Sequence, residues 1–146
     1  MKAETGRAAK EGQIIKQREY SNQLEVDRYI GAEMCARCHE SEYEKWSATA
    51  HASAWTTLVD VDMHESGDCV SCHVTGHGEK TGFEDFRMKP NLAGVQCEAC
   101  HNMGTLHAVG GEDRASLSAD ACVGCHDAEN SPDFDLTDYL EKIRHW

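Results

Sequence analysis

The sequence predicts a mainly α-helical protein, with short helices and long loops wrapped round a compact cluster of bound groups and little or no sheet. Only 40% of the 146 residues are hydrophobic and the mean hydropathy is −0.62, so the side chains alone supply a thin core. Helix-start signals recur along the chain, whereas little of it looks like a strand. Something other than side chains must therefore fill the middle.

Two helices are expected in the N-terminal half. Residues 3–20 are good helix formers apart from two glycines. Ser41, followed three residues later by Glu44, forms a capping box, in which each side chain bonds a free backbone amide at the start of a helix. The pattern predicts a helix that runs from Ser41 to about Val59.

The C-terminal half contains two further helix-start signals and a long loop. Ser118 predicts the cap of a short helix, and Asp135 predicts the cap of a helix that runs to Trp146, because both side chains accept hydrogen bonds from free backbone amides. Residues 75–96 are rich in glycine and are interrupted by Pro90, which favours an extended loop.

The cysteines carry the strongest signal. All eight fall into four copies of the pattern C-x-x-C-H, numbered here 1 to 4 in chain order. Two thiols at this spacing can form thioethers to the two vinyl groups of one haem, and the following imidazole then lies under the ring and binds the iron. The four motifs are Cys35, Cys38 and His39; Cys69, Cys72 and His73; Cys97, Cys100 and His101; and Cys122, Cys125 and His126.

Other uses of paired cysteines fit less well. A four-cysteine zinc site or a redox dithiol needs C-x-x-C but has no use for a histidine directly after the second cysteine. The pattern therefore predicts four covalently attached haems c, with iron bound by His39, His73, His101 and His126. Their spacing gives about one haem per thirty residues, which is too close for separate protein cores. We expect the haems to share one compact core.

The location and partners follow from attachment and charge. Covalent haem attachment takes place outside the cytoplasm, so we expect an exported protein, periplasmic or extracellular. Residues 1–28 are a polar, charged extension or linker without the apolar core of a signal peptide. We therefore expect that the signal peptide is not in this sequence. Residues 29–146 form the expected tetrahaem domain. No run is long enough to span a membrane. The net charge of −12 argues against nucleic acid as a partner and fits redox proteins with a basic docking face, and it fits equally well an acidic surface that only keeps the protein in solution.

The second axial ligand of each iron must come from elsewhere in the chain. Five histidines lie outside the motifs, and four irons need at most four of them. On the expected helix, His51 shares a stripe with the small Ala54, which leaves room for a ring. His145 falls opposite the apolar stripe of its helix and can bind iron only if the helix frays or is covered on both sides. The five are His51, His64, His77, His107 and His145.

Residues between the motifs resemble those of the cytochrome c-554 family. The likeness extends from residue 29 to the C-terminus and includes segments outside the haem motifs, namely Tyr29-Ile30-Gly31-Ala32-Glu33, then Tyr43, Trp46, His51 and Ala52, then Cys72-His73-Val74-Thr75-Gly76, then Gly94-Val95-Gln96-Cys97-Glu98-Ala99-Cys100-His101.

The resemblance implies a mainly helical fold with haems paired 1 with 3 and 2 with 4. It also implies that His107 is the distal ligand of haem 1, His51 that of haem 3 and His145 that of haem 4. Haem 2 has no protein distal ligand in the founding member of the family. In this chain His64 precedes motif 2 and His77 follows it. We favour His64 over His77 as the distal ligand of haem 2, and the alternative is a haem that is open or has an external ligand.

The function predicted from these features is electron transport, not catalysis. Iron between two imidazoles stays six-coordinate in both redox states, so no substrate enters and reorganisation is small. Two alternatives remain: an oxidoreductase of small nitrogen species at an open haem 2, and a subunit of an extracellular conducting filament that associates through faces exposing haem.

Overall fold

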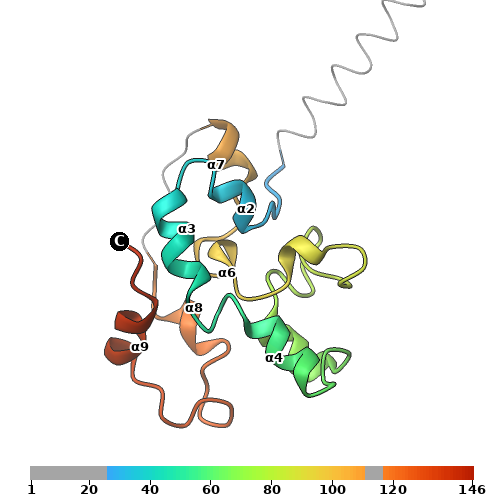
Figure 1. The fold of residues 1–146 in the computed structure, drawn as a ribbon, viewed down its shortest axis with the longest axis vertical. Coiled ribbons are helices and arrows are strands. Elements are labelled where there is room, and N and C mark those ends of the chain that lie inside the picture. Colours follow the sequence, from blue (N-terminus) through green and yellow to red (C-terminus); the bar gives the residue numbers. More distant parts are fainter. Residues whose placement is uncertain (1–25, 111–116) are drawn as a thin grey trace, which may run out of the picture.

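The computed structural model describes residues 26–110 and 117–146 (Figure 1). The expected helix at residues 3–20, and all but the end of the expected 1–28 extension, lie outside these ranges. The helices are α2 (Ala32–Cys35), α3 (Glu40–Ser47), α4 (Ala54–Asp60), α5 (Gly67–His73), the 3-10 helix η1 (Pro90–Leu92), α6 (Cys97–His101), α7 (Thr105–Gly110), α8 (Asp120–Val123) and α9 (Leu136–Ile143).

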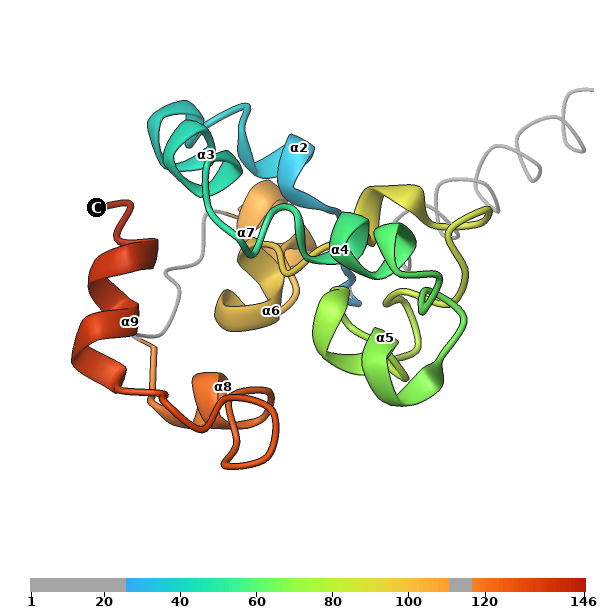
Figure 2. The same ribbon diagram turned by 60° about the horizontal axis from the view of Figure 1, so that its bottom comes forward.

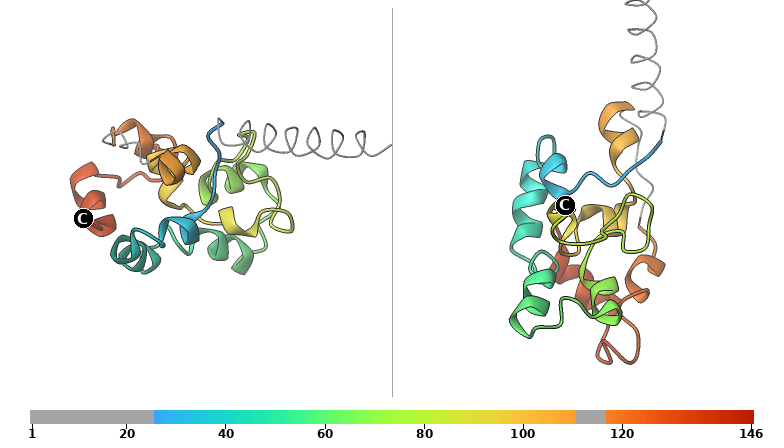
Figure 3. Two further views of the ribbon diagram at one scale, coloured as in Figure 1. Left: turned by 90° about the horizontal axis from the view of Figure 1, so that it is seen from above. Right: turned by 90° about the vertical axis from the view of Figure 1, so that its right-hand side faces the viewer.

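The expected fold class is confirmed. Long connections join the short helices, and within the described ranges the β-structure consists of one isolated antiparallel bridge between Val74 and Ala93. Helix α6 lies near the centre, with α4 and α5 on one side and α8 and α9 on the other (Figure 2). The view from above shows the same arrangement (Figure 3, left). No helix in the described part of the chain has the length and apolar character needed to cross a membrane.

The helix expected from Ser41 to about Val59 is wrong in both its start and its length. Helix α3 begins at Glu40, with His39 as a cap residue whose side chain makes no capping bond, and it ends at Ser47. Helix α4 begins only at Ala54. The intervening turn is held by another segment, because the backbone N–H of Val95 donates to the carbonyl oxygen of His51 at 3.0 Å. That carbonyl is therefore bonded outside the helix.

The two C-terminal caps had different outcomes. Asp135 caps α9 as expected, since its carboxylate accepts from the backbone amides of Thr137 and Asp138 at 3.0 and 3.1 Å. The helix ends at Ile143, not at Trp146. Ser118 does not cap α8, because its hydroxyl donates to the carboxylate of Asp120 at 3.3 Å.

A small protein core surrounds motif 2. Five buried side chains from α4, α5 and the 74–93 segment form one cluster. Helices α3, α7, α8 and α9, in contrast, contain no buried residue. The side-chain core therefore covers only one part of the described chain, as the low hydrophobic content predicts. The five are Leu58, Val70, Val74, Phe83 and Leu92.

A buried polar pair supports this core. The hydroxyl of Thr75, which is fully buried, donates to the carbonyl oxygen of Gly94 at 2.8 Å and accepts from the backbone N–H of Gln96 at 3.0 Å. The side-chain oxygen of Gln96 in turn accepts from the backbone N–H of Ala32 at 2.7 Å. These bonds hold the segment that enters motif 1 against the segment that enters motif 3.

Candidate haem-binding sites

Each C-x-x-C-H motif forms one helical turn. Motif 2 ends α5 and motif 3 is the whole of α6. In motifs 1 and 4 the backbone N–H of the histidine donates to the carbonyl oxygen of the first cysteine, at 2.9 Å for His39 to Cys35 and 2.9 Å for His126 to Cys122. One turn brings both thiols and the imidazole to the same side, as attachment to one ring requires.

Three histidine pairs face one another across the described structure. The ring centres lie 6.0 Å apart for His39 and His107, 6.0 Å for His51 and His126, and 6.1 Å for His101 and His145. Metal–imidazole bonds are about 2 Å long, so an iron atom between two imidazoles separates their centres by about 6 Å. The three pairs therefore fit an iron held on both faces, each pair combining one motif histidine with one from outside the motifs.

The ring pairs differ from two of the partners that the resemblance implies. His51 faces His126 of motif 4, not motif 3, and His145 faces His101 of motif 3, not motif 4. His51 lies in the turn between α3 and α4, so the helical stripe that guided its placement does not exist. His145 lies beyond the end of α9, which allows the chain to turn back, and its carbonyl oxygen accepts from Lys45 Nζ at 3.4 Å.

Several imidazoles are already oriented by their other ring nitrogen. His73 Nδ1 lies 2.7 Å from the carbonyl oxygen of Ala54, and His126 Nδ1 lies 3.1 Å from the hydroxyl of Ser131. His145 Nδ1 lies 2.9 Å from the carbonyl oxygen of Ile143. A bond at Nδ1 fixes the ring and leaves Nε2 for a metal. Sequence reasoning missed Ala54 and Ser131 in this role, because neither has a pattern that ties it to a motif.

The environment of His51 favours its metal-binding form. Burial lowers the pKa of His51, and the neighbouring His126 lowers it further. Both effects disfavour the protonated ring. The neutral imidazole is the form that binds metals.

The motifs approach one another in two pairs. Interaction with the Cys97 thiol raises the pKa of Cys35, which places motif 1 beside motif 3. Burial, together with interaction with the Cys72 thiol, raises the pKa of Cys125 to about 12, which places motif 4 beside motif 2. A cavity of about 800 Å³ contains the thiols and histidines of motifs 2 and 4 together. Its shared lining fits the expectation of a common core.

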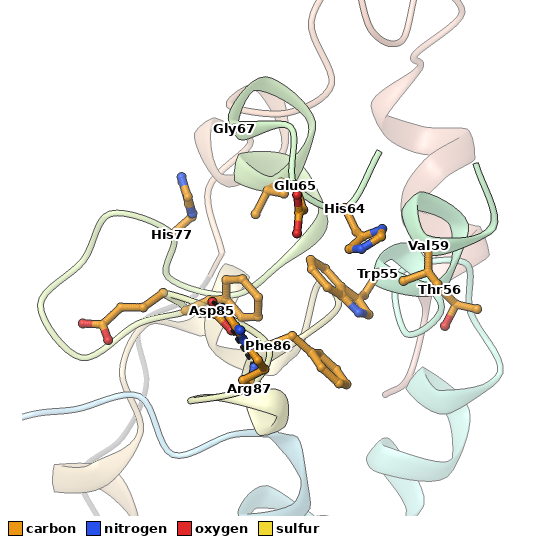
Figure 4. Close-up of a pocket in the computed structure, with 13 residues that line it drawn as sticks. Trp55, Thr56, Val59, His64, Glu65, Gly67, His77, Asp85, Phe86 and Arg87 are labelled. Carbon is orange, nitrogen blue, oxygen red and sulfur yellow. Dashed lines mark hydrogen bonds and ion pairs between the residues drawn. The ribbon is translucent and has the colours of Figure 1, made fainter. Parts of the chain in front are cut away.

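His73 of motif 2 differs from the other three motif histidines. Among the described residues, no histidine ring lies opposite it at a comparable distance. His64 instead lines a second cavity of about 840 Å³, with its ring edge against Trp55 at 6.0 Å (Figure 4). The cysteines of motif 2 do not line this cavity. His77 lies across it and points away from His64 (Figure 4).

His64 has one further feature in that cavity. Its Nδ1 atom is buried without a hydrogen-bond partner among the described residues, and the carboxylate of Asp62 lies 3.8 Å away. The structure thus places His51, His107 and His145 each opposite a motif histidine, whereas His64 shares a cavity with Val70 of motif 2 but with neither cysteine of that motif.

The chain is similar to known cytochromes in sequence and in fold. The family described as cytochrome c554 and c-prime matches residues 34–102. Cytochrome c-554 of Nitrosomonas europaea is 36% identical over 91 residues, which is 52% of this chain and 39% of that protein. The solved structure of reduced cytochrome c554 from the same organism matches with a TM-score of 0.64 and 23% identity, over 82% of this chain and 86% of that one.

These proteins are c-type cytochromes by name, and the four C-x-x-C-H motifs of this chain fit covalent attachment of haem c. The predicted resemblance to the cytochrome c-554 family is confirmed. The chain spans about two fifths of the length of the curated relative that it matches.

Proposed function

We propose that the chain binds four haems c and relays electrons between redox proteins. The observation that carries this proposal is the set of three opposed histidine pairs, each of which includes the histidine of a C-x-x-C-H motif. Haem iron supplies the one-electron couple. The residues His39, His101 and His126 hold one face of each of three sites, and His107, His145 and His51 hold the other.

Two imidazoles per iron suit relay better than catalysis. A fixed pair of nitrogen ligands keeps the coordination the same in both redox states and excludes substrate from the metal. Bonds at Nδ1 of His126 and His145 hold these rings in place as the charge changes. The proposed partners are redox proteins with a basic docking face, because the chain has a net charge of −12. The proposed location is the periplasm.

The first prediction concerns the number of haems. Under denaturing conditions, we expect the mass of the mature protein to equal the polypeptide plus four haems, because thioether bonds survive unfolding. Mass spectrometry of the intact protein measures this directly. Replacing both Cys122 and Cys125 with alanine is the matched variant, and its expected mass is lower by one haem. A wild-type protein with fewer than four haems would contradict the proposal.

A second candidate function is binding of a small ligand at motif 2. It is favoured by the absence, within the described ranges, of an imidazole opposite His73. An open face at this site permits the alternative reaction with a small nitrogen species. An oxidised protein with a high-spin signal from one haem in four supports this candidate, whereas four low-spin haems exclude it.

The second prediction concerns whether His64 binds the iron at motif 2. Because His64 lines a cavity that contains neither thiol of motif 2, its replacement with alanine is expected to leave the ferric spectrum unchanged. The matched control is His107→Ala, which removes the partner of His39 and is expected to add the high-spin signal of one haem. Electronic absorption of the oxidised proteins measures both. A new high-spin signal in the His64 variant would show that this side chain reaches the iron.

A further inference from the structure

Glu98 is a buried acid that the proposed ligand sets do not use. It lies between the two cysteines of motif 3 and is only 3% exposed. Its carboxylate accepts hydrogen bonds from three backbone amides: Ile30 at 3.0 Å to each oxygen, Gly31 at 2.8 Å and Gly104 at 2.8 Å. Buried acids are rare unless they are paired or hydrogen-bonded in this way.

The donors show which form of the side chain the site holds. Each carboxylate oxygen has two backbone N–H groups directed at it. A proton on either oxygen would compete with these donors, so the geometry selects the anion. Burial raises the pKa of Glu98, and the three backbone hydrogen bonds oppose that effect. The site therefore contains a fixed negative charge beside motif 3.

The three amides belong to segments that build the first haem site. Ile30 and Gly31 lead directly into α2, which ends at Cys35 of motif 1. Gly104 precedes α7, which contains His107, the ring that faces His39. One carboxylate on motif 3 thus holds both the attachment side and the distal side of site 1.

The local backbone suits this arrangement. Gly31 has φ +84°, a backbone conformation that residues with a side chain rarely adopt. A Cβ at this position would also lie 2.7 Å from the carbonyl oxygen of Asn91. Asn102, directly after motif 3, has φ +64° and ψ 174°, a backbone conformation that is costly for any residue with a side chain. Gly31 itself donates to Glu98, and Asn102 lies between motif 3 and the Gly104 amide that also donates to it.

We propose that Glu98 is a positioning residue for electron transfer: its carboxylate clamps both segments of site 1 onto motif 3, and its charge lowers the reduction potentials of the haems at motifs 1 and 3. This proposal rests on the proposed function, because it assumes haems at both motifs. A buried anion stabilises ferric over ferrous iron, since the oxidised state has one more positive charge. The clamp fixes how far motif 1 lies from motif 3, on which the rate of electron exchange depends.

The test compares Glu98→Gln with Glu33→Gln in the mature holoprotein. Both changes remove one carboxylate near motif 1, but Glu33 is exposed on α2, where water screens its charge. We expect Glu98→Gln to raise the reduction potentials of two haems by about 59 mV, which corresponds to a roughly tenfold change in the one-electron equilibrium constant. Spectroelectrochemical titration measures all four potentials. A shift no larger than that of Glu33→Gln overturns the proposal.

A second variant separates the charge from the clamp. Glu98→Asp keeps the charge but shortens the reach by one methylene, so its potentials are expected to stay near the wild-type values while the thermal midpoint falls. Equal shifts in potential for Asp and Gln would assign the effect to structural damage instead of charge. If neither variant matures, hydrogen exchange in the wild-type protein decides: rapid exchange of the Ile30 and Gly31 amides, which lie outside the helices, overturns the clamp.

The proposal and the proposed function fail in distinguishable ways. A wild-type protein without four haems contradicts the proposed function whatever Glu98 does. Four haems with potentials that are insensitive to Glu98→Gln contradict only the role of Glu98.

Discussion

Replacing His51 with alanine is expected to open one iron to a high-spin state, and that iron is the one attached to motif 4. The ring of His51 lies 6.0 Å from that of His126, and burial keeps it in the neutral form that binds metal. Loss of the ring leaves no comparable partner for His126 among its described histidine contacts. We expect the high-spin signal of one additional haem in the oxidised protein, by absorption and electron paramagnetic resonance.

The site of the opened iron can be assigned with a second background. In a protein whose Cys122 and Cys125 are replaced with alanine, the haem of motif 4 is missing, so His51→Ala is expected to add no high-spin signal there. His145→Ala should still add one in that background, because His145 faces His101 of motif 3. If His51→Ala adds the signal in that background, His51 serves motif 3 and the pairing is wrong.

Replacing Gly82 with alanine is expected to destabilise the protein strongly. A Cβ at Gly82 would lie in forbidden contact with the carbonyl oxygen of Gly76, a backbone atom that cannot rotate away. The two glycines close a narrow loop, which the bond from Phe83 N–H to the Thr75 carbonyl oxygen at 3.0 Å joins to the buried core. We expect a loss of about 3 kcal/mol or more in the free energy of unfolding, at the upper end of the cost of overpacking.

Gly67→Ala is the control for this variant. An added Cβ at Gly67, the first residue of α5, meets nothing within 4 Å. Alanine also favours the helix, so we expect a change within about 1 kcal/mol. Chemical denaturation of the two holoproteins, followed by circular dichroism, measures the difference. Similar midpoints for both variants would show that the loop at Gly82 relaxes freely.

The motifs could be predicted from the sequence because their chemistry is local. Two cysteines and a histidine within five residues form one helical turn, whatever the rest of the chain does. The cap at Asp135 is local too, and it was predicted correctly. Ser41 shows the limit of such signals: its capping box is sound as a pattern, but α3 already begins at Glu40, so Ser41 lies inside the helix.

The partners of the motif histidines could not be predicted from local patterns. His51 was placed on a helical stripe, yet the bond from Val95 N–H to its carbonyl oxygen holds it in a turn. The placement of His145 depends on where α9 ends. The ring that it faces, His101, lies 44 positions earlier in the chain. The bonds of Glu98 to Ile30 and Gly31 likewise join segments that are distant in sequence. Such contacts are set by the tertiary path of the chain.

The uneven distribution of buried side chains also determines which part of the protein opens most readily. Amide hydrogen exchange reports local unfolding, whose free energy depends on how much apolar surface a region buries. Around motif 2, the buried cluster that includes Leu58 and Leu92 is expected to slow amide exchange in α4, in α5 and in the loop that leads from α5 to η1. Helices α8 and α9 contain no buried residue, although they line the cavity shared by motifs 2 and 4. These two helices bury no side chain against the protein itself, so their packing is expected to depend on the haem attached at motif 4, and loss of that haem should weaken hydrogen-exchange protection here before it does so around motif 2.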